Sequence, residues 1–197
     1  MEIYVIQTPN DKKRENSFNL EIFDQSFDGR DIKHYEAIMD KNMPRRGISK
    51  SHRAIVQIAK DQGREEVCVL EDDIKFLTPH SLERFLNIHK LIPKDYSMYM
   101  IGLYDGIIEK EFGGYAKVSG RISGLHGYII SSKFYDAFLS ADENLNLDFY
   151  ISEYLKPTIY CMYPFGAIQF DGFSYNTKQI MNYNYNLYKK YKLLGNE

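Results

Sequence analysis

Two short apolar runs set the strongest limit on what this chain can fold into. Residues 3–6 and 67–70 are continuously apolar and rich in β-branched residues, a pattern typical of strands buried on both faces of a sheet. Further apolar runs alternate along the chain with stretches of helical periodicity. This alternation predicts an α/β fold with a largely parallel central sheet and helices on both faces.

Turn and cap signals suggest where the other elements begin and end. We expect helices from Ser49 to Gly63, from Thr78 to Pro93, over Ser132–Leu139 and over Leu147–Leu155, and strands over Tyr99–Leu103, His126–Ile130 and Thr158–Tyr163. Residues 15–46 give no clear pattern and carry no assignment. Without a repeat or a linker, residues 1–176 are predicted to form one domain. Residues 177–197 then form a tail or helix, either docked or frayed, or a basic amphipathic surface helix.

The composition excludes several classes of function. A formal net charge of −2 lacks the positive potential that broad nucleic-acid binding requires, so no nucleic-acid partner is expected. No segment approaches the roughly 18 apolar residues of a membrane span, and the first residues lack the pattern of a secretory signal. Cys68 and Cys161 lie within apolar runs and read as buried free thiols. The expected compartment is the cytoplasm.

The second apolar run leads directly into Glu71, Asp72 and Asp73. Three adjacent carboxylates beside a buried strand repel one another, and a divalent cation such as Mn²⁺ or Mg²⁺ would remove that cost. Alternation along an extended chain points Glu71 and Asp73 to one side, where they are predicted to bind the metal. Asp72 then reaches a ribose or orders a neighbouring loop. The alternative is that Asp72 or Asp73 caps a turn or the next helix.

The segment from Gly47 to His52 is followed by a helix and then by a strand that ends in Glu-Asp-Asp. This pairing resembles the lipooligosaccharide-biosynthesis glycosyltransferases of family 25, although Ile48 replaces the cysteine usual in the family. Supporting similarity lies in residues 92–96 with Leu103, in 123–131, in 147–149 and in 164–169. The resemblance covers about residues 47–176, with a weak echo over 4–14.

The resemblance implies a GT-A fold whose acidic motif holds Mn²⁺ or Mg²⁺ against the donor diphosphate. It also implies transfer of a sugar, often galactose, with inversion, from a nucleotide-sugar donor to a glycan or lipid-linked saccharide such as lipooligosaccharide. A UDP-sugar is the favoured donor. Ser51 and His52 match the motif and are expected on the nucleotide side of the cleft. Asp148 matches the position of a catalytic base, although a carboxylate there can equally complement a helix dipole.

Other candidates come from their positions in the chain. Thr8 and Arg14 follow the first strand, where the nucleoside would sit; Arg14 is alternatively a surface charge. His126 either completes the metal shell or is a plain histidine at the start of a strand. Gln169 and Asp171 follow the last strand and are candidates for contacts to the acceptor or the phosphates.

Two other functions compete with this one. A phosphohydrolase of the haloacid-dehalogenase type carries its aspartate nucleophile at the end of the first strand, whereas this strand ends in Gln7-Thr8. The second is a non-catalytic module that binds nucleotide or polysaccharide on a transferase-like scaffold. The intact Glu-Asp-Asp triplet favours the enzyme over this module, which stays open.

Overall fold

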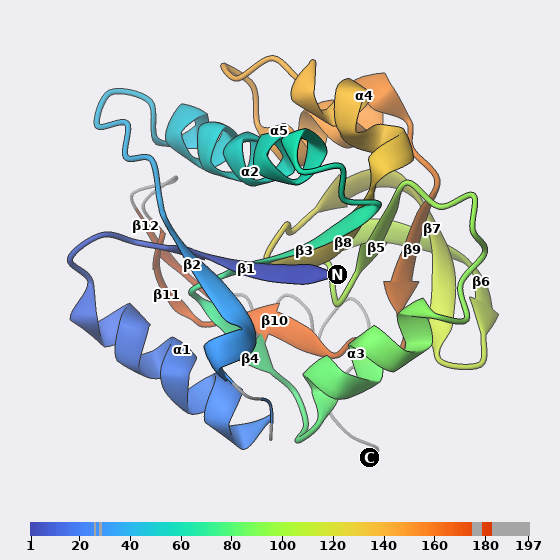
Figure 1. Ribbon diagram of the computed structural model, residues 1–197, viewed down its shortest axis with the longest axis horizontal. Coiled ribbons are helices and arrows are strands. Elements are labelled where there is room, and N and C mark those ends of the chain that lie inside the picture. The colour runs from blue at the N-terminus through green and yellow to red at the C-terminus, as the bar shows by residue number, and fades with distance from the viewer. Residues whose placement is uncertain (26, 28, 175–178, 183–197) are drawn as a thin grey trace.

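A computed structural model describes residues 1–25, 27, 29–174 and 179–182 (Figure 1). It confirms an α/β fold. The strands are β1 (Glu2–Gln7), β2 (Ile32–Glu36), β3 (Glu66–Glu71), β4 (Ile74–Phe76), β5 (Met98–Met100), β6 (Asp105–Phe112), β7 (Tyr115–Ser123), β8 (Gly127–Ser131), β9 (Ile159–Met162), β10 (Ala167–Gln169), β11 (Gly172–Ser174) and β12 (Gln179–Met181). The α-helices are α1 (Lys12–Asp24), α2 (Pro44–Asp61), α3 (Ser81–His89), α4 (Tyr135–Leu139) and α5 (Leu147–Tyr150), with 3₁₀ turns at Gly29–Asp31 and Ser132–Phe134 and a π-helical turn at Ile151–Leu155.

The central sheet is mixed, which corrects the expectation of a largely parallel one. Its strand order is β2-β1-β3-β8-β5-β9-β7-β6. The pairs β2–β1, β1–β3 and β5–β9 are parallel, whereas β8 runs antiparallel to both β3 and β5, and β7 runs antiparallel to β9 and β6. The physical reason is the connection between β5 and β8, which is the β6–β7 hairpin. Parallel neighbours need a crossover connection, usually a helix, and this connection contains none.

Helices cover both faces of this sheet, as predicted. In Figure 1, α2, α4 and α5 lie on one face, and α1 and α3 lie on the other. Strand β3 shows how the sequence serves both layers. Val67 and Val69 join the cluster that contains Val56 of α2, while Cys68 and Leu70 join the one that contains Phe85 of α3. Successive side chains point to opposite faces, so a strand between two helical layers must be apolar throughout.

The structure assigns the stretch that the sequence left open. Asp11 caps α1, because its Oδ1 accepts a hydrogen bond from Arg14 N at 3.1 Å. Strand β2 then adds to the edge of the sheet beside β1. At the far end of the chain, β12 pairs with β11. The other residues of the expected C-terminal tail lie outside the described part, so its predicted helix is untested.

Helix α2 begins at Pro44, earlier than the N-cap predicted at Ser49. Proline suits the first helical position because its missing N–H needs no partner there. The carboxylate of Asp40 accepts hydrogen bonds from Met43 N and Asn42 N and fixes the chain that enters the helix. Ser49 is instead fully buried inside the helix. In the part of the chain that the structure describes, no helix has the length and apolar character of a membrane span.

A glycine in α2 allows the loop after β2 to approach this helix closely. A Cβ on Gly47 would overlap the carbonyl oxygen of Ile38 and crowd Asp40 N. We predict that Gly47→Ala destabilises the fold by about 1–3 kcal/mol, the usual cost of overpacking. At this chain length Tm would fall by roughly 2–12 °C.

Thermal unfolding followed by circular dichroism measures this change. Gly113→Ala is the matched control, because a Cβ at Gly113 meets no atom within 4 Å. Equal Tm values for the two variants would contradict the close approach at Gly47.

Candidate functional site

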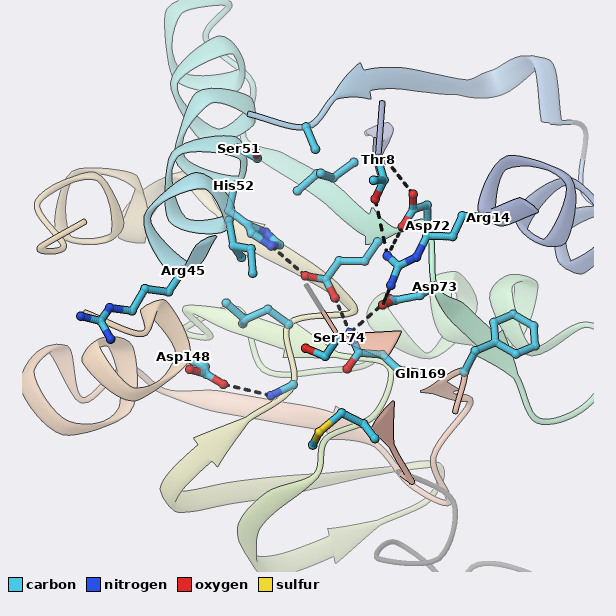
Figure 2. A pocket seen from close by; sticks show the side chains of 18 of the residues that line it. Thr8, Arg14, Arg45, Ser51, His52, Asp72, Asp73, Asp148, Gln169 and Ser174 are labelled. Atoms are coloured by element: carbon cyan, nitrogen blue, oxygen red, sulfur yellow. Dashed lines mark hydrogen bonds and ion pairs between the residues drawn. The ribbon is translucent and has the colours of Figure 1, made fainter. Parts of the chain in front are cut away.

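A cleft of about 790 Å³ opens where β1 and β3 end, between helices α1, α2 and α5 (Figure 2). In α/β sheets, ligands bind outside the carboxyl ends of the strands. All eight residues predicted for the site line this cleft: Thr8, Arg14, Ser51, His52, Glu71, Asp72, Asp73 and Asp148. The fold thus brings together side chains that are up to 140 positions apart (Thr8 and Asp148) in the sequence. Their individual roles stay predictions.

The acidic triplet is fixed by backbone hydrogen bonds on each side. Glu71 N donates to His126 O at 2.9 Å, and Asp72 N donates to Ile6 O at 3.1 Å. Asp73 O in turn accepts a hydrogen bond from Phe170 N at 2.8 Å. The three carboxylates are therefore presented on a rigid turn between β3 and β4.

The predicted alternation of the three carboxylates is present. Glu71 and Asp73 reach one common donor, because Gln169 Nε2 lies 2.6 Å from Glu71 Oε2 and 3.1 Å from Asp73 Oδ1. Asp72 turns away and is 3% exposed. Its Oδ2 accepts a hydrogen bond from Thr8 N at 2.6 Å, and its Oδ1 accepts one from Arg14 Nη1 at 2.8 Å. Asp72 is therefore hydrogen-bonded to the loop after β1, and its role in nucleotide binding stays a prediction.

Arg14 joins the two sides of the triplet. Besides its bond to Asp72, its Nη2 lies 3.2 Å from Asp73 Oδ2. Figure 2 shows this guanidinium between Thr8, Asp72 and Asp73. The cation thus offsets part of the negative charge in the cleft, in contrast to the alternative of a free surface charge.

His52 supports Glu71 from behind. The ring is 1% exposed, with Nε2 at 3.1 Å from Glu71 Oε1 and Nδ1 at 3.0 Å from the Tyr128 hydroxyl. Since an ionised carboxylate can only accept, His52 Nε2 carries a proton and donates it to the hydrogen bond with Glu71. Burial alone would raise the pKa of Glu71, but the hydrogen bond and charge of His52, with His126 and Arg14, outweigh it and lower the pKa.

Asp73 is shifted in the opposite direction. Burial and the neighbouring charge of Glu71 raise the pKa of Asp73 to about 7, although Arg14 and Gln169 act against the rise. Glu71 and Asp73 thus face one point, and the positive charge around them is too small for both carboxylates to ionise readily. This is the environment in which a divalent cation is stabilising.

The donor set fits Mn²⁺ or Mg²⁺. Carboxylate oxygens are ligands that both ions prefer, and both commonly complete their shell with water and phosphate oxygens. Within the described ranges no group of three or more His, Cys, Asp or Glu side chains is placed to hold a metal ion. Of the triplet, Glu71 and Asp73 are the two carboxylates that could bind such an ion, since Asp72 is engaged by Thr8 and Arg14.

Asp148 and Ser51 lie on the other walls of the cleft. Asp148 is in the first turn of α5, where its Oδ1 accepts from Phe149 N at 2.8 Å and its Oδ2 from Gly124 N at 3.4 Å. The Ser51 hydroxyl donates to Gly47 O at 2.9 Å and accepts from Ile38 N at 2.8 Å. Ser51 therefore holds the loop after β2 against α2.

His126 is positioned differently from the metal-shell alternative. It is fully buried behind the cleft wall, packs against the Tyr104 ring at 5.3 Å, and places Nε2 3.3 Å from Ala167 O. These contacts fit the alternative of a plain histidine at the start of a strand. Its backbone carbonyl, rather than its ring, bonds the acidic triplet.

Some cleft residues have no role predicted from the sequence. Arg45 and Met39 lie in the stretch without a sequence pattern, whereas Tyr104 and Ser123 flank a hairpin whose sequence shows only a glycine-rich interval. Gln169 is predicted only as a possible contact to acceptor or phosphate. Its place beside Glu71 follows from the antiparallel pairing of β10 with β4, a long-range pairing that no local signal in the sequence reveals.

No protein-family model matches this sequence, and no curated protein matches it. Solved structures do. A197 from STIV is 14% identical, covers 86% of each chain and has a TM-score of 0.50. Mannose-1-phosphate geranyltransferase from Thermus thermophilus is 8% identical over 82% of this chain and 74% of its own, with a TM-score of 0.51. The UTP-bound UGPase from Acinetobacter baumannii is 11% identical over 98% of this chain and 79% of its own, with a TM-score of 0.50.

At these identities the comparisons show the fold alone. It is an α/β fold with a mixed central sheet, similar to GT-A and nucleotidyltransferase structures. The resemblance to family 25 is supported at the level of the fold, and no family-level match supports it.

The raised pKa of Asp73 predicts a pH-dependent stability. In metal-free protein the folded state binds the Asp73 proton more tightly than the unfolded state does, so this contribution to stability is full at low pH and is lost as pH rises through about 7. Asp73→Asn removes this titration. The Tm of the variant minus the Tm of the unsubstituted protein should therefore be larger at pH 8 than at pH 5, by on the order of 5 °C.

The measurement is thermal unfolding in EDTA at both pH values. Asp136→Asn is the control, because that carboxylate is 84% exposed and lies outside the cleft. A Tm difference for Asp73→Asn that is the same at both pH values would rule out the raised pKa.

Proposed function

We propose that this chain is a metal-dependent glycosyltransferase. It transfers a sugar, with galactose a candidate, from a nucleotide-sugar donor to a glycan or lipid-linked saccharide, with inversion; a UDP-sugar is the favoured donor. One observation carries the proposal: the cleft at the end of β3 presents the carboxylates of Glu71 and Asp73 to a common point, with Asp148 on another wall.

Glu71 and Asp73 would hold the cation, which supplies a positive charge to the leaving diphosphate. His52 keeps Glu71 ionised and oriented, because its N–H donates to one of the two carboxylate oxygens. Arg14 adds a fixed positive charge beside Asp73. These residues are already hydrogen-bonded in position, so little reorganisation is needed when negative charge develops on the donor.

Thr8 and Arg14 support a nucleoside site beside the end of β1. Asp72 fixes this region, since it accepts from Thr8 N and Arg14 Nη1 while it is itself buried. The neighbouring wall contains the apolar side chains of Ile6, Met39 and Ile48. Such a wall suits the flat face of a base, and Asp72 contributes by shaping it.

Asp148 is the proposed base. Inversion requires direct attack of the acceptor hydroxyl on the sugar, with a carboxylate that takes up the proton of that hydroxyl. Within the described part of the chain, Asp148 accepts hydrogen bonds from two backbone N–H groups, at 2.8 and 3.4 Å, and each carboxylate oxygen has a further lone pair for this task. Figure 2 shows it apart from the Asp73 side of the cleft, so the donor would lie between metal and base.

The loop after β1 favours sugar transfer over nucleotidyl transfer from a triphosphate. Loops that cradle triphosphates use glycines to present an array of free N–H groups. Here Thr8 N donates to Asp72, Pro9 has no N–H, and Asp11 N lies 3.5 Å from Thr8 O. The loop contains no glycine. The non-catalytic binding module stays the alternative, and activity measurements separate it from the enzyme.

Donor binding should depend on the metal. Mn²⁺ with the matching nucleotide at 100 times its Kd should stabilise the protein by roughly 2.7 kcal/mol and raise Tm by about 5–10 °C. UDP, GDP, CMP and dTDP are compared with and without Mn²⁺ or Mg²⁺. The shift should vanish in Asp73→Ala and persist in the control Asp136→Ala. Absence of a shift with every nucleotide, metal present, would sink the donor site.

Asp148 should be required for transfer but not for donor binding. We expect Asp148→Asn to lower turnover by about 10²-fold or more while it retains the Tm shift with metal and nucleotide. The assay uses UDP-galactose and a lipooligosaccharide acceptor and follows the release of UDP. If another nucleotide binds, the corresponding nucleotide-sugar is the donor and the release of that nucleotide is followed. Asp136→Asn is again the control. Full turnover in Asp148→Asn would exclude it as the base.

A further inference from the structure

The side chain of Gln169 lies between the two carboxylates that face each other in the cleft. Its Nε2 is 2.6 Å from Glu71 Oε2 and 3.1 Å from Asp73 Oδ1. Ionised carboxylates only accept hydrogen bonds, so the NH₂ end of the amide faces them. The dashed lines in Figure 2 show this bridge. The amide thus lies where a cation shared by Glu71 and Asp73 would lie.

The backbone on both sides of Gln169 is anchored. Gln169 N donates to the Tyr104 hydroxyl at 2.7 Å, and the next residue, Phe170, donates its N–H to Asp73 O at 2.8 Å. Strand β10 also pairs with β4, with Gln169 opposite Ile74. The main chain that carries the amide therefore keeps a fixed distance from the acidic turn, while the terminal torsion of a glutamine has a broad, roughly two-fold profile.

Among the described residues, the other side chains near Glu71 and Asp73 that could bind a cation are already engaged. Asp72 is engaged by Thr8 and Arg14, and the ring of His52 is held between Tyr128 and Glu71. In the described part of the chain, no third His, Cys, Asp or Glu joins Glu71 and Asp73 in a metal-binding group. An amide carbonyl is also a hard oxygen ligand, and Gln169 brings one to the same point.

We propose that Gln169 is the third protein ligand of the cation. A half-turn of its side-chain amide then converts the metal-free arrangement into the metal-bound one. In the metal-free state the NH₂ group holds Glu71 and Asp73 together. In the metal-bound state the amide oxygen takes its place and faces the ion. This inference rests on the proposed metal site and assigns a residue that the acidic motif does not contain.

Because of these two states, the direction in which metal affinity changes on substitution of Gln169 reveals its role. A Gln169 that only held the carboxylates together would compete with the cation, and its removal would leave metal binding unchanged or make it tighter. A Gln169 that binds the cation gives the opposite result, because its removal takes away one ligand. In both cases the metal-free protein loses a donor between two carboxylates.

The experiment measures Mn²⁺ affinity by calorimetry and by the electron paramagnetic resonance signal of free Mn²⁺, at pH 8 and without nucleotide. Gln169→Leu removes both polar atoms at similar size, and we expect Mn²⁺ binding to weaken by about 10-fold or more. Gln169→Glu keeps an oxygen and should bind Mn²⁺ at least as tightly as the unsubstituted protein. Gln57→Leu is the control, because that glutamine is exposed on α2 and bonds Asp61.

Each outcome decides a different point. Unchanged or tighter binding in Gln169→Leu overturns the ligand role of Gln169, as does binding in Gln169→Glu that is weaker than in the unsubstituted protein. Should Gln169→Leu not fold, Gln169→Ala takes its place, because it also removes the amide oxygen and has the same two outcomes. Absence of Mn²⁺ binding by the unsubstituted protein contradicts the metal site of the proposed function itself, and is thereby distinguished from a failure of the Gln169 assignment.

Discussion

The electrostatic balance around the end of β3 is the constraint on which the cleft depends. Three carboxylates follow one another where the strand leaves the core, and the fold supplies a different partner for each. Arg14 and Thr8 bind Asp72, His52 binds Glu71, and Gln169 bridges Glu71 and Asp73. These partners come from α1, the loop after β1, α2 and β10. The carboxylates of one short turn therefore bind side chains or backbone from four separate parts of the chain.

The sequence was sufficient wherever the signal is local. Strands between two helical layers are apolar at every position, and residues 3–6 and 67–70 could be recognised for that reason. The acidic triplet stands directly after the second of these strands, so its place at a strand end could also be predicted. Thr8 and the acidic triplet meet in one cleft because the carboxyl ends of the neighbouring parallel strands β1 and β3 lie at one edge of the sheet.

The sequence was insufficient wherever tertiary pairing decides. Helix α1 buries only Phe18 and Ile22, while Leu20 and Phe23 on it are exposed, so it shows no clear apolar stripe. Strand β8 is buried throughout, and a run of buried residues does not reveal whether a strand runs parallel or antiparallel to its neighbours. The same holds for Gln169, whose position depends on the register between two three-residue strands.

The pairing of β4 with β10 has a consequence for the order in which this protein is made. Glu71 and Gln169 are 98 positions apart, and the carboxylates leave the ribosome long before the amide does. A nascent chain that ends before β10 carries the acidic turn without its bridge and without the backbone bond from Phe170 to Asp73. The charged end of β3 therefore reaches its final arrangement only after β10 has been synthesised, and so after every strand of the central sheet.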